Sequence, residues 1–310
     1  MALWVGAVAL GLAFAAMALG VYLTFRVLSF PDLTVDGSFP LGAAVSAVLI
    51  AKLGWAAWLT LPAAGLAGAL AGITTALLAT RLKINGLLAG ILVSIALWTV
   101  NLRIMGDRSN VPLLGVDTVI SPVAPQTTDI AKALNVSSTD IGGVIVFAAL
   151  ATGLGVALVW FLHTELGLAL RATGDNERMI RALGTDTDAM KLLGLGIANA
   201  LVALSGALVA HYQGFADVST GLGMIVAGLA SLIIGETLLR PRGVGSTVLA
   251  VILGVIAYRL VIAAALFVGL GPTDMRLVTS VIVILALTLP QVRRPRTAFG
   301  QRQLAGLAGR

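Results

Sequence analysis

Cysteine is absent from the 310 residues. Its absence excludes disulfide bonds, thiolate metal sites and cysteine nucleophiles. The sequence also lacks a GxxxxGK[ST] motif, an HExxH motif and a GxSxG motif. The residues therefore give no sign that this chain hydrolyses a nucleotide or holds a catalytic metal, and we expect no cofactor, no metal site and no enzymatic activity in it.

Charged residues are scarce as well. They make up 11% of the chain, whereas hydrophobic residues reach 58% and the mean hydropathy is +1.02; an ordinary soluble domain has about 25% charged residues. The composition predicts an all-α polytopic membrane protein, folded as one transmembrane domain over residues 1–310. The net charge of +6 comes from short loops and the tail, as membrane topology requires, and does not indicate nucleic-acid binding.

Long apolar runs predict about nine transmembrane segments (about 8–10), because a span needs about 20 residues. The first helical half, 1–105, holds runs at 2–25, 41–50, 53–79 and 85–105. The second half, 141–290, holds runs at 141–163, 192–212, 221–238, 244–268 and 277–289. The 36 glycines, with GxxxG spacings at Gly68/Gly72 and Gly86/Gly90, are typical of closely packed membrane helices.

Basic residues in short loops predict which side is cytoplasmic. Arg81 and Lys83, residues 165–191, Arg240 and Arg242, and the tail 291–310 fall on one side if each run crosses once. This side, with the C terminus, is expected to be cytoplasmic. The interval 106–140, which has four acidic and two basic side chains, is then an extracytoplasmic loop, and counting back places the N terminus outside.

The interval 29–40 contains two prolines and a glycine, which break a helix. The run after it, Leu41–Ile50, is too short to cross a bilayer alone. Either a helix begins near Asp36, capped by Asp36 or Ser38, or a broken helix lies at membrane depth. Residues 35–50 resemble 218–234 in pattern, which is a faint sign of an inverted repeat.

The stretch 164–191 concentrates nine charges between two apolar runs, so it must lie outside the bilayer. Its apolar residues recur at roughly helical spacing, with a helix start at Asp175–Glu177 and a stop at Gly184. It could dock on a partner protein or lie among lipid headgroups. Five acids against four bases favour the partner, since interfacial helices usually carry excess Lys and Arg.

Two motifs carry a resemblance to a known family. Residues of the charged stretch (Gly167, Arg171-Ala172, Gly174, Asn176 and Gly184) and the run FPDLTVDGSFPLGAA at 30–44 resemble permease subunits of bacterial ABC importers of the branched-chain amino acid and ribose type. The second run is similar to a subfamily associated with uptake of amino acid-like solutes or aromatic amino acids.

The resemblance implies a division of labour in the bacterial plasma (inner) membrane. Two permease copies, in a homodimer surrounded by membrane lipid, form the pathway; ABC ATPase subunits carry ATP and Mg; an extracytoplasmic solute-binding protein delivers an amino acid or related compound. The charged stretch becomes a cytoplasmic coupling helix, and the residues expected to couple to the ATPase are Glu165, Gly167, Arg171, Ala172, Gly174, Asn176, Arg178 and Gly184.

Polar residues at the break are candidates for lining the substrate pathway, because free backbone groups at membrane depth need a wet cavity. An ordinary loop with Asp-Gly turn chemistry is the alternative, and the resemblance favours the pathway. The candidates are Thr34, Asp36, Ser38 and Phe39, with Ser219 and Thr220 as their counterparts in the second half.

Arg259 lies well inside the run 244–268, where an ionisable residue is a functional candidate. It could meet a substrate carboxylate, pair with Asp217, or extend to the outer interface. Glu236 is expected to pair with Arg240, four residues later.

An ion-gradient-driven secondary transporter is the main alternative function. Such proteins usually place carboxylates in mid-membrane, and no acid lies at the centre of a predicted span. An intramembrane enzyme would need a cluster of catalytic side chains, and the sequence contains none.

Overall fold

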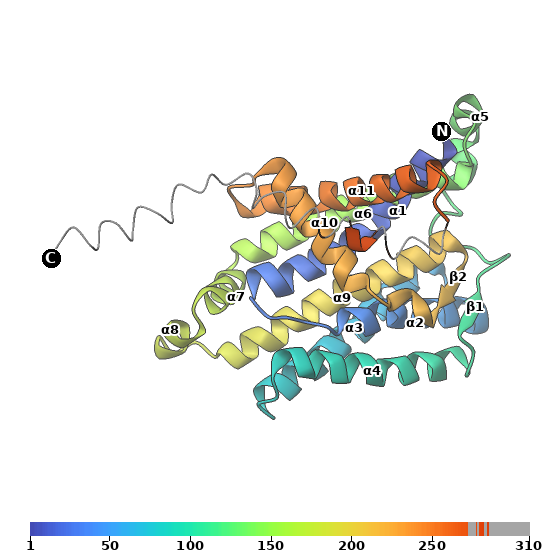
Figure 1. The fold of residues 1–310 in the computed structure, drawn as a ribbon. Coiled ribbons are helices and arrows are strands. Elements are labelled where there is room, and N and C mark those ends of the chain that lie inside the picture. Colours follow the sequence, from blue (N-terminus) through green and yellow to red (C-terminus); the bar gives the residue numbers. More distant parts are fainter. Residues whose placement is uncertain (272–276, 278, 282–283, 285–310) are drawn as a thin grey trace, which may run out of the picture.

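The structure is a computed structural model that describes residues 1–271, together with residues 277, 279–281 and 284. Nearly all of the described elements are helices, which run roughly along one direction (Figure 1). Helices α7 (Glu165–Asp175) and α8 (Glu177–Ala182) lie at one end of the molecule, and α5 (Thr128–Leu134) and the N terminus lie at the other. We refer to these as the α8 end and the α5 end.

Seven helices of the described chain are long and apolar enough to cross a membrane. They are α1 (Ala2–Tyr22) with its continuing π-helical turn η1 (Leu23–Val27), α2 (Val35–Leu53), α3 (Ala57–Thr80), α4 (Gly86–Met105), α6 (Ser138–His163), α9 (Thr187–Gln213) and α11 (Val244–Phe267). Helix α10 (Met224–Leu239) is apolar but has only 16 residues. The all-α polytopic prediction is confirmed. Most of the ninth predicted span, 277–289, and all of the tail 291–310 lie outside the described residues, so the count of about nine stays a prediction.

Helix α9 forms the centre of the packing, against α1, α2 and α3. Close approach requires glycine at the α3 contact: a Cβ at Gly68 would lie 2.2 Å from the carbonyl oxygen of Asn199, and one at Gly72 would lie 2.1 Å from that of Leu195. The first GxxxG pair therefore lets two backbones touch. The second pair, Gly86 and Gly90, packs α4 against Phe30 and Leu33 of the break.

The break after α1 leads into the interior. Residues 28–34 are not helical, and α2 starts beside the middle of α4, because a Cβ at Gly37 would meet Ser94 and Leu97. From there α2 runs to the α5 end, where Lys52 lies next to Gly106. The expectation of a helix starting near Asp36 is confirmed. The expected cap is wrong: Thr34 is the N-cap residue, and neither Asp36 nor Ser38 caps α2.

The second half contains a matching break. After α9 the chain forms β2 (Phe215–Asp217) and the short 3-10 helix η3 (Val218–Gly221) before α10 begins. A Cβ at Gly221 would meet the carbonyl oxygen of Asp36, so α10 starts where α2 starts. Its other end lies beside Arg26 at the end of α1. The two segments that the sequence pairs as repeats thus begin side by side and run in opposite directions.

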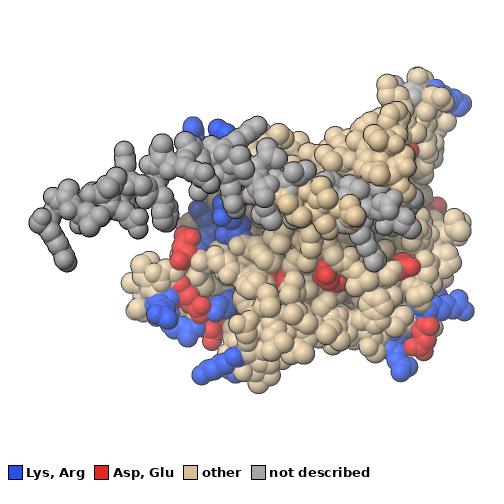
Figure 2. Space-filling view, viewed as in Figure 1, with Lys and Arg blue, Asp and Glu red and all other residues tan. Residues whose placement is uncertain are grey.

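The interval 106–140 packs over the α5 end. Its strand β1 (Asn110–Pro112) pairs with β2 in an antiparallel register, and it also holds the 3-10 helix η2 (Ala124–Thr127) and α5 (Thr128–Leu134). On the face that Figure 2 shows, the basic side chains gather at the two ends of the molecule, and the belt between them carries only a few acidic side chains. This distribution is what a bilayer around the belt demands.

Candidate functional site

The junction of α2 and α10 is built around Asp36. One oxygen of its carboxylate, Oδ1, accepts a hydrogen bond from the backbone N–H of Ile225 at 2.9 Å, and Oδ2 accepts one from Gly223 at 3.3 Å. These amides belong to the first turn of α10, where the helix dipole favours a negative charge. Asp36 therefore caps α10 instead of its own helix, and it fixes the two helix starts together.

A second carboxylate lies just before the junction. The side chain of Asp32 is fully buried and accepts hydrogen bonds from the Thr34 backbone N–H at 2.9 Å and from the Asn199 amide at 2.7 Å. Asn199 also accepts a hydrogen bond from Ser38 at 2.7 Å, and Thr34 shares a 2.6 Å hydrogen bond with Thr75. This network joins the break to α3 and α9. Thr34 and Ser38 are fully buried within it.

Arg259 lies beside the junction on α11. Its guanidinium stands 3.8 Å from the centroid of the Phe14 ring, and that ring stacks on Phe39 at 5.4 Å and 6°. The Nε atom is buried and has no hydrogen-bond partner in the described chain. The expected pair with Asp217 does not form: no ion pair among the described residues includes Arg259, and Asp217 accepts instead from the N–H and hydroxyl of Ser219.

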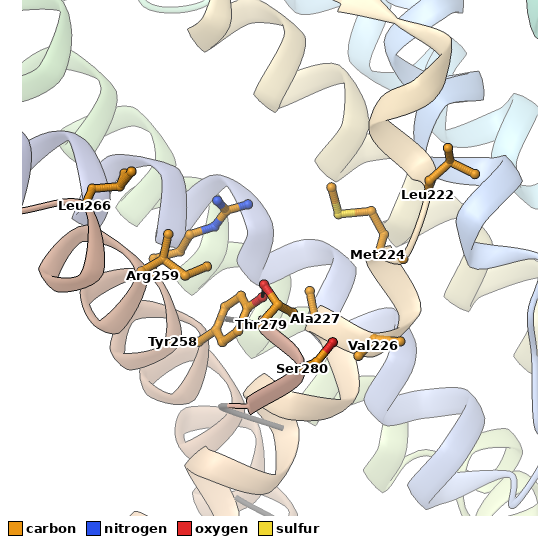
Figure 3. A pocket seen from close by; sticks show the side chains of 11 residues that line it. Leu222, Met224, Val226, Ala227, Tyr258, Arg259, Leu266, Thr279 and Ser280 are labelled. Carbon is orange, nitrogen blue, oxygen red and sulfur yellow. Dashed lines mark hydrogen bonds between the residues drawn. The ribbon is translucent and has the colours of Figure 1, made fainter. Parts of the chain in front are cut away.

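Arg259 also lines a cavity of about 620 Å³ between α10 and α11. Figure 3 shows its guanidinium extending toward the start of α10, with Met224 on the opposite wall and Tyr258, Thr279 and Ser280 below. The wall contains Gly223, whose N–H donates to Asp36, and the next residue, Met224. A solute in this cavity would meet one cation, hydroxyl groups and apolar side chains, as is typical of sites for small molecules.

The second-half candidates lie just before α10. Ser219 is exposed and Thr220 is half-buried, and the Thr220 hydroxyl donates to the Asp217 carbonyl. Neither is among the residues that line the 620 Å³ cavity. Glu236, at the other end of α10, pairs with Arg26 at 2.9 Å. The expected Glu236–Arg240 pair is therefore wrong. Arg240 has a φ of 44°, so the helix has already ended and the i,i+4 geometry is lost.

The predicted coupling region forms two helices, α7 (Glu165–Asp175) and α8 (Glu177–Ala182). Asn176 caps α8 by accepting from the Met179 N–H, and Gly184, at φ 90°, follows its end, as the sequence predicts. Gly174 packs α7 on the end of α1, because a Cβ there would lie 1.9 Å from the Val27 carbonyl oxygen. Gly167 is buried in a similar contact with Phe161.

The remaining coupling candidates differ in exposure. Glu165, Asn176, Arg178 and Gly184 are exposed, whereas Arg171 and Ala172 are half-buried. An ion-pair network holds α8 against the start of α9: Glu177 binds Lys191 at 2.7 Å and Arg181 at 3.1 Å, and Arg181 also binds Asp188 at 2.9 Å. The hydrogen bond from Lys191 is the main reason why the pKa of Glu177 lies below its usual value.

Sequence reasoning missed several residues of the junction. Asn199, Phe14 and Tyr258 lie in long apolar runs, where single polar or aromatic residues carry no pattern. Asp32 lies in the break and gave a signal, since a carboxylate within a Pro-rich interruption at membrane depth needs partners. Asp32 precedes α2 and Asp36 lies in its first turn, so neither acid is at the centre of a predicted span. Both are held by hydrogen bonds that fix the fold.

Two helices that begin side by side after breaks in the chain, next to a cavity lined by one cation, are typical of multi-pass transport proteins. Comparisons with known proteins agree. The family profile described as branched-chain amino acid transport system / permease component matches residues 4–288. The chain therefore belongs to this family of permease components, and it is the membrane-spanning part of an ABC importer for a small solute.

Individual relatives cover different shares of the chain. A tyrosine transport system permease protein of Clostridioides difficile (strain R20291) is 37% identical over 268 residues, which is 86% of this chain and 84% of that protein. An uncharacterised protein of Rickettsia prowazekii (strain Madrid E) is 32% identical over 87% of this chain and 91% of that protein. The autoinducer 2 import system permease protein LsrC of Photorhabdus laumondii is 34% identical over 101 residues, 32% of this chain and 29% of that protein. No solved structure gives a significant match.

Proposed function

We propose that this permease carries an amino acid, with an aromatic amino acid such as tyrosine as the first solute to test. The observation that carries the proposal is the position of Arg259 on the wall of the 620 Å³ cavity, with a buried Nε that has no partner in the described chain. An unpaired guanidinium in an apolar surrounding favours a carboxylate, which it can bind through two parallel hydrogen bonds. The name of the Clostridioides difficile relative supports an amino acid as solute.

Phe14 and Phe39 give Arg259 a rigid support. The Phe14 ring under the guanidinium holds the charge by a cation–π contact, and Phe39 buttresses that ring. Phe39 therefore acts on the pathway through Phe14 and Arg259, without lining the cavity itself. Asp36 keeps the start of α10 in place on the opposite wall.

The α8 end is the proposed cytoplasmic face, where separate ABC ATPase subunits with their ATP and Mg would dock. Exposed apolar side chains at α8, Met179 at 54% and Leu183 at 73%, are suited to insertion into a groove of a partner. Arg178 and Asn176 would flank this contact, and Gly167 and Gly174 would transmit its movement, because they press α7 on the membrane helices.

The rest of the assembly follows from this orientation. The basic tail and the C terminus would lie in the cytoplasm of a bacterial cell whose plasma membrane holds the protein. The N terminus and the interval 106–140 would face an extracytoplasmic solute-binding protein, and a second copy of this chain would complete the pathway. Ser219 and Thr220, near the α5 end, remain candidates for contact with the entering solute.

Copurification tests the docking part of the proposal. The tagged full chain is coexpressed with the ABC ATPase subunit of its own cell, and the amount of ATPase recovered with it is measured. In a second assay, ATP-dependent uptake of labelled tyrosine is measured in vesicles. Leu183→Asp should reduce the recovered ATPase, since it places a charge in the groove. Leu82→Asp is the matched control: Leu82 lies at the same end, is 65% exposed and is outside α7 and α8. Wild-type chain that binds no ATPase, or uptake driven by an ion gradient without ATP, would contradict the proposal.

A further inference from the structure

Two adjoining cavities open at the α8 end, away from the junction. They have volumes of about 330 and 310 Å³ and share Tyr22, Arg26, Pro241 and Thr247 in their walls. The walls come from the end of α1, from α7 and from the turn between α10 and α11. We call the joined cavities the arginine pocket, after Arg26, Arg171, Arg240 and Arg242, which all line them.

The arginine pocket carries an excess of positive charge. Its four arginines face two acids, Glu236 and Asp175. Glu236 is already bound to Arg26. No ion pair within the described part of the chain includes Arg171, Arg240 or Arg242. Three arginines that form no ion pair in the described chain therefore line the pocket together with one such carboxylate, Asp175, and this excess of positive charge attracts an anion.

Tyr22 supplies a second, independent sign of a ligand. Its side chain is only 5% exposed, and it lies in the wall that both cavities share. Its hydroxyl has no hydrogen-bond partner among the described residues, although the charges of Arg171, Glu236 and Arg26 are near enough to act on it. The hydroxyl is not one of the fully buried atoms that lack a partner, so it borders the open space of the pocket and can donate to a group that enters there.

The start of α11 strengthens the attraction. Gly243 and Val244, where this 24-residue helix begins, line the second cavity. Ser246 accepts hydrogen bonds from the Arg242 and Gly243 N–H groups and so holds the turn in place. The positive end of the helix dipole therefore points toward the arginines.

We propose that the arginine pocket binds a phosphate group and that the phosphate belongs to the headgroup of an anionic membrane lipid. The pocket lies where α1 and α11, both long enough to span a membrane, reach the α8 end, and this is the depth of the headgroups. Arginine, a tyrosine hydroxyl and a helix start are the donors that a phosphate prefers. A lipid bound there would tie α7 to α1 and α11.

Lipid binding to the full chain in detergent tests this proposal by native mass spectrometry. Phosphatidylglycerol and phosphatidylcholine are titrated separately, with inorganic phosphate and glycerol 3-phosphate as soluble competitors. Arg242→Gln and Tyr22→Phe should each weaken phosphatidylglycerol binding about tenfold, the loss of one charge-assisted hydrogen bond. Tyr22→Phe keeps the ring and its packing, so it tests the hydroxyl without opening the core. Arg81→Gln, an exposed arginine at the same end, is the control and should bind like wild type.

Each outcome decides the proposal. Preferred binding of phosphatidylglycerol that both variants weaken supports the lipid site. If millimolar inorganic phosphate displaces phosphatidylglycerol, the pocket binds a phosphate group but a soluble phosphate is its ligand, and the assignment to a lipid is overturned. Equal binding of the two lipids, or equal weakening by Arg81→Gln, would overturn it. If Arg242→Gln leaves lipid binding intact and loses only the ATPase, the pocket is a protein contact instead.

Discussion

The junction offers the sharpest prediction, which is the replacement of Asp36 by alanine. Asp36 accepts hydrogen bonds from Ile225 at 2.9 Å and Gly223 at 3.3 Å, and it carries the only side chain that caps α10 in the described structure. Removal of a helix cap costs about 1–2 kcal/mol, and a charge at a partly buried helix terminus contributes up to about 2 kcal/mol. Since both terms describe the same contact, we expect a loss of about 2 kcal/mol in the local stability of the first turn of α10.

Hydrogen exchange measures that loss directly. A change of about 2 kcal/mol corresponds to an approximately thirtyfold faster local opening. The full chain is placed in lipid nanodiscs, and exchange is followed by mass spectrometry in peptides that cover 220–230. Asp36→Asn, which keeps one acceptor oxygen but loses the charge, should fall between wild type and Asp36→Ala.

A second cap provides the matched control. Asp186 caps α9 by accepting from the Asp188 and Ala189 N–H groups. Asp186→Ala should speed exchange at the start of α9 and leave α10 unchanged. Unchanged exchange of α10 in Asp36→Ala, or equal acceleration in both variants, would refute the reasoning that the α2 carboxylate holds α10.

Three further predictions follow. Gly72→Ala should lower the free energy of unfolding by about 1–3 kcal/mol, because its Cβ meets the Leu195 carbonyl oxygen and overpacks the contact. In the control Gly153→Ala, the Cβ meets nothing within 4 Å, so this variant should not destabilise α6. Thermal or denaturant unfolding measures both, and an equal loss in the two variants would contradict the packing argument. The lowered pKa of Glu177 means that its bond to Lys191 stabilises α8 fully above the ordinary glutamate pKa of about 4.3 and loses this stability as the pH falls through the lower folded-state value. The local opening of α8, measured as its exchange rate relative to the intrinsic rate at the same pH, should therefore increase only in acid. Glu177→Gln should abolish that pH dependence. Arg259→Gln should lower tyrosine uptake about tenfold or more with ATPase recovery intact, and an equal effect on uptake of tyramine, which lacks the carboxylate, would exclude the proposed contact.

Features of the fold that depend on neighbouring residues could be predicted from the sequence. Most of the apolar runs among the described residues match a helix within a few residues, because the bilayer sets helix length and composition, but the run 41–50 covers only part of α2. The start of α8 at Asn176 and its end before Gly184 follow from capping chemistry, which is equally local. The apolar run did not predict where α9 begins. Asp186 caps this helix, so α9 begins at Thr187, and its charged first turn precedes the apolar run that starts at Leu192.

The candidate site depended on partners far apart in the chain, and the sequence could not supply them. Asp36 binds Ile225, 189 positions away, and Arg26 binds Glu236, 210 positions away. The i,i+4 spacing predicted that Glu236 pairs with Arg240, but Arg240 itself has left-handed backbone geometry at the end of the helix, so the spacing does not apply there. The position of Arg259 over Phe14 likewise requires two spans to be adjacent, and the adjacency comes from packing.

The contacts also connect the two functional regions. Gly174 of α7 presses on the Val27 carbonyl at the end of α1, and the non-helical residues 28–34 lead from there to Asp36. Asp32 in this segment is fixed to Asn199 of α9, and Asp36 is fixed to the start of α10, which forms a wall of the Arg259 cavity. A displacement of α7 therefore cannot leave the cavity unchanged unless residues 28–34 absorb it. Because Asp32 is buried and hydrogen-bonded, that segment has little freedom to do so, and we expect α7 and the start of α10 to move together. Demonstration of this coupling requires exchange in α10 to respond when an ATPase subunit binds at α8; if Asp36→Ala leaves that response intact, the connection runs through other contacts.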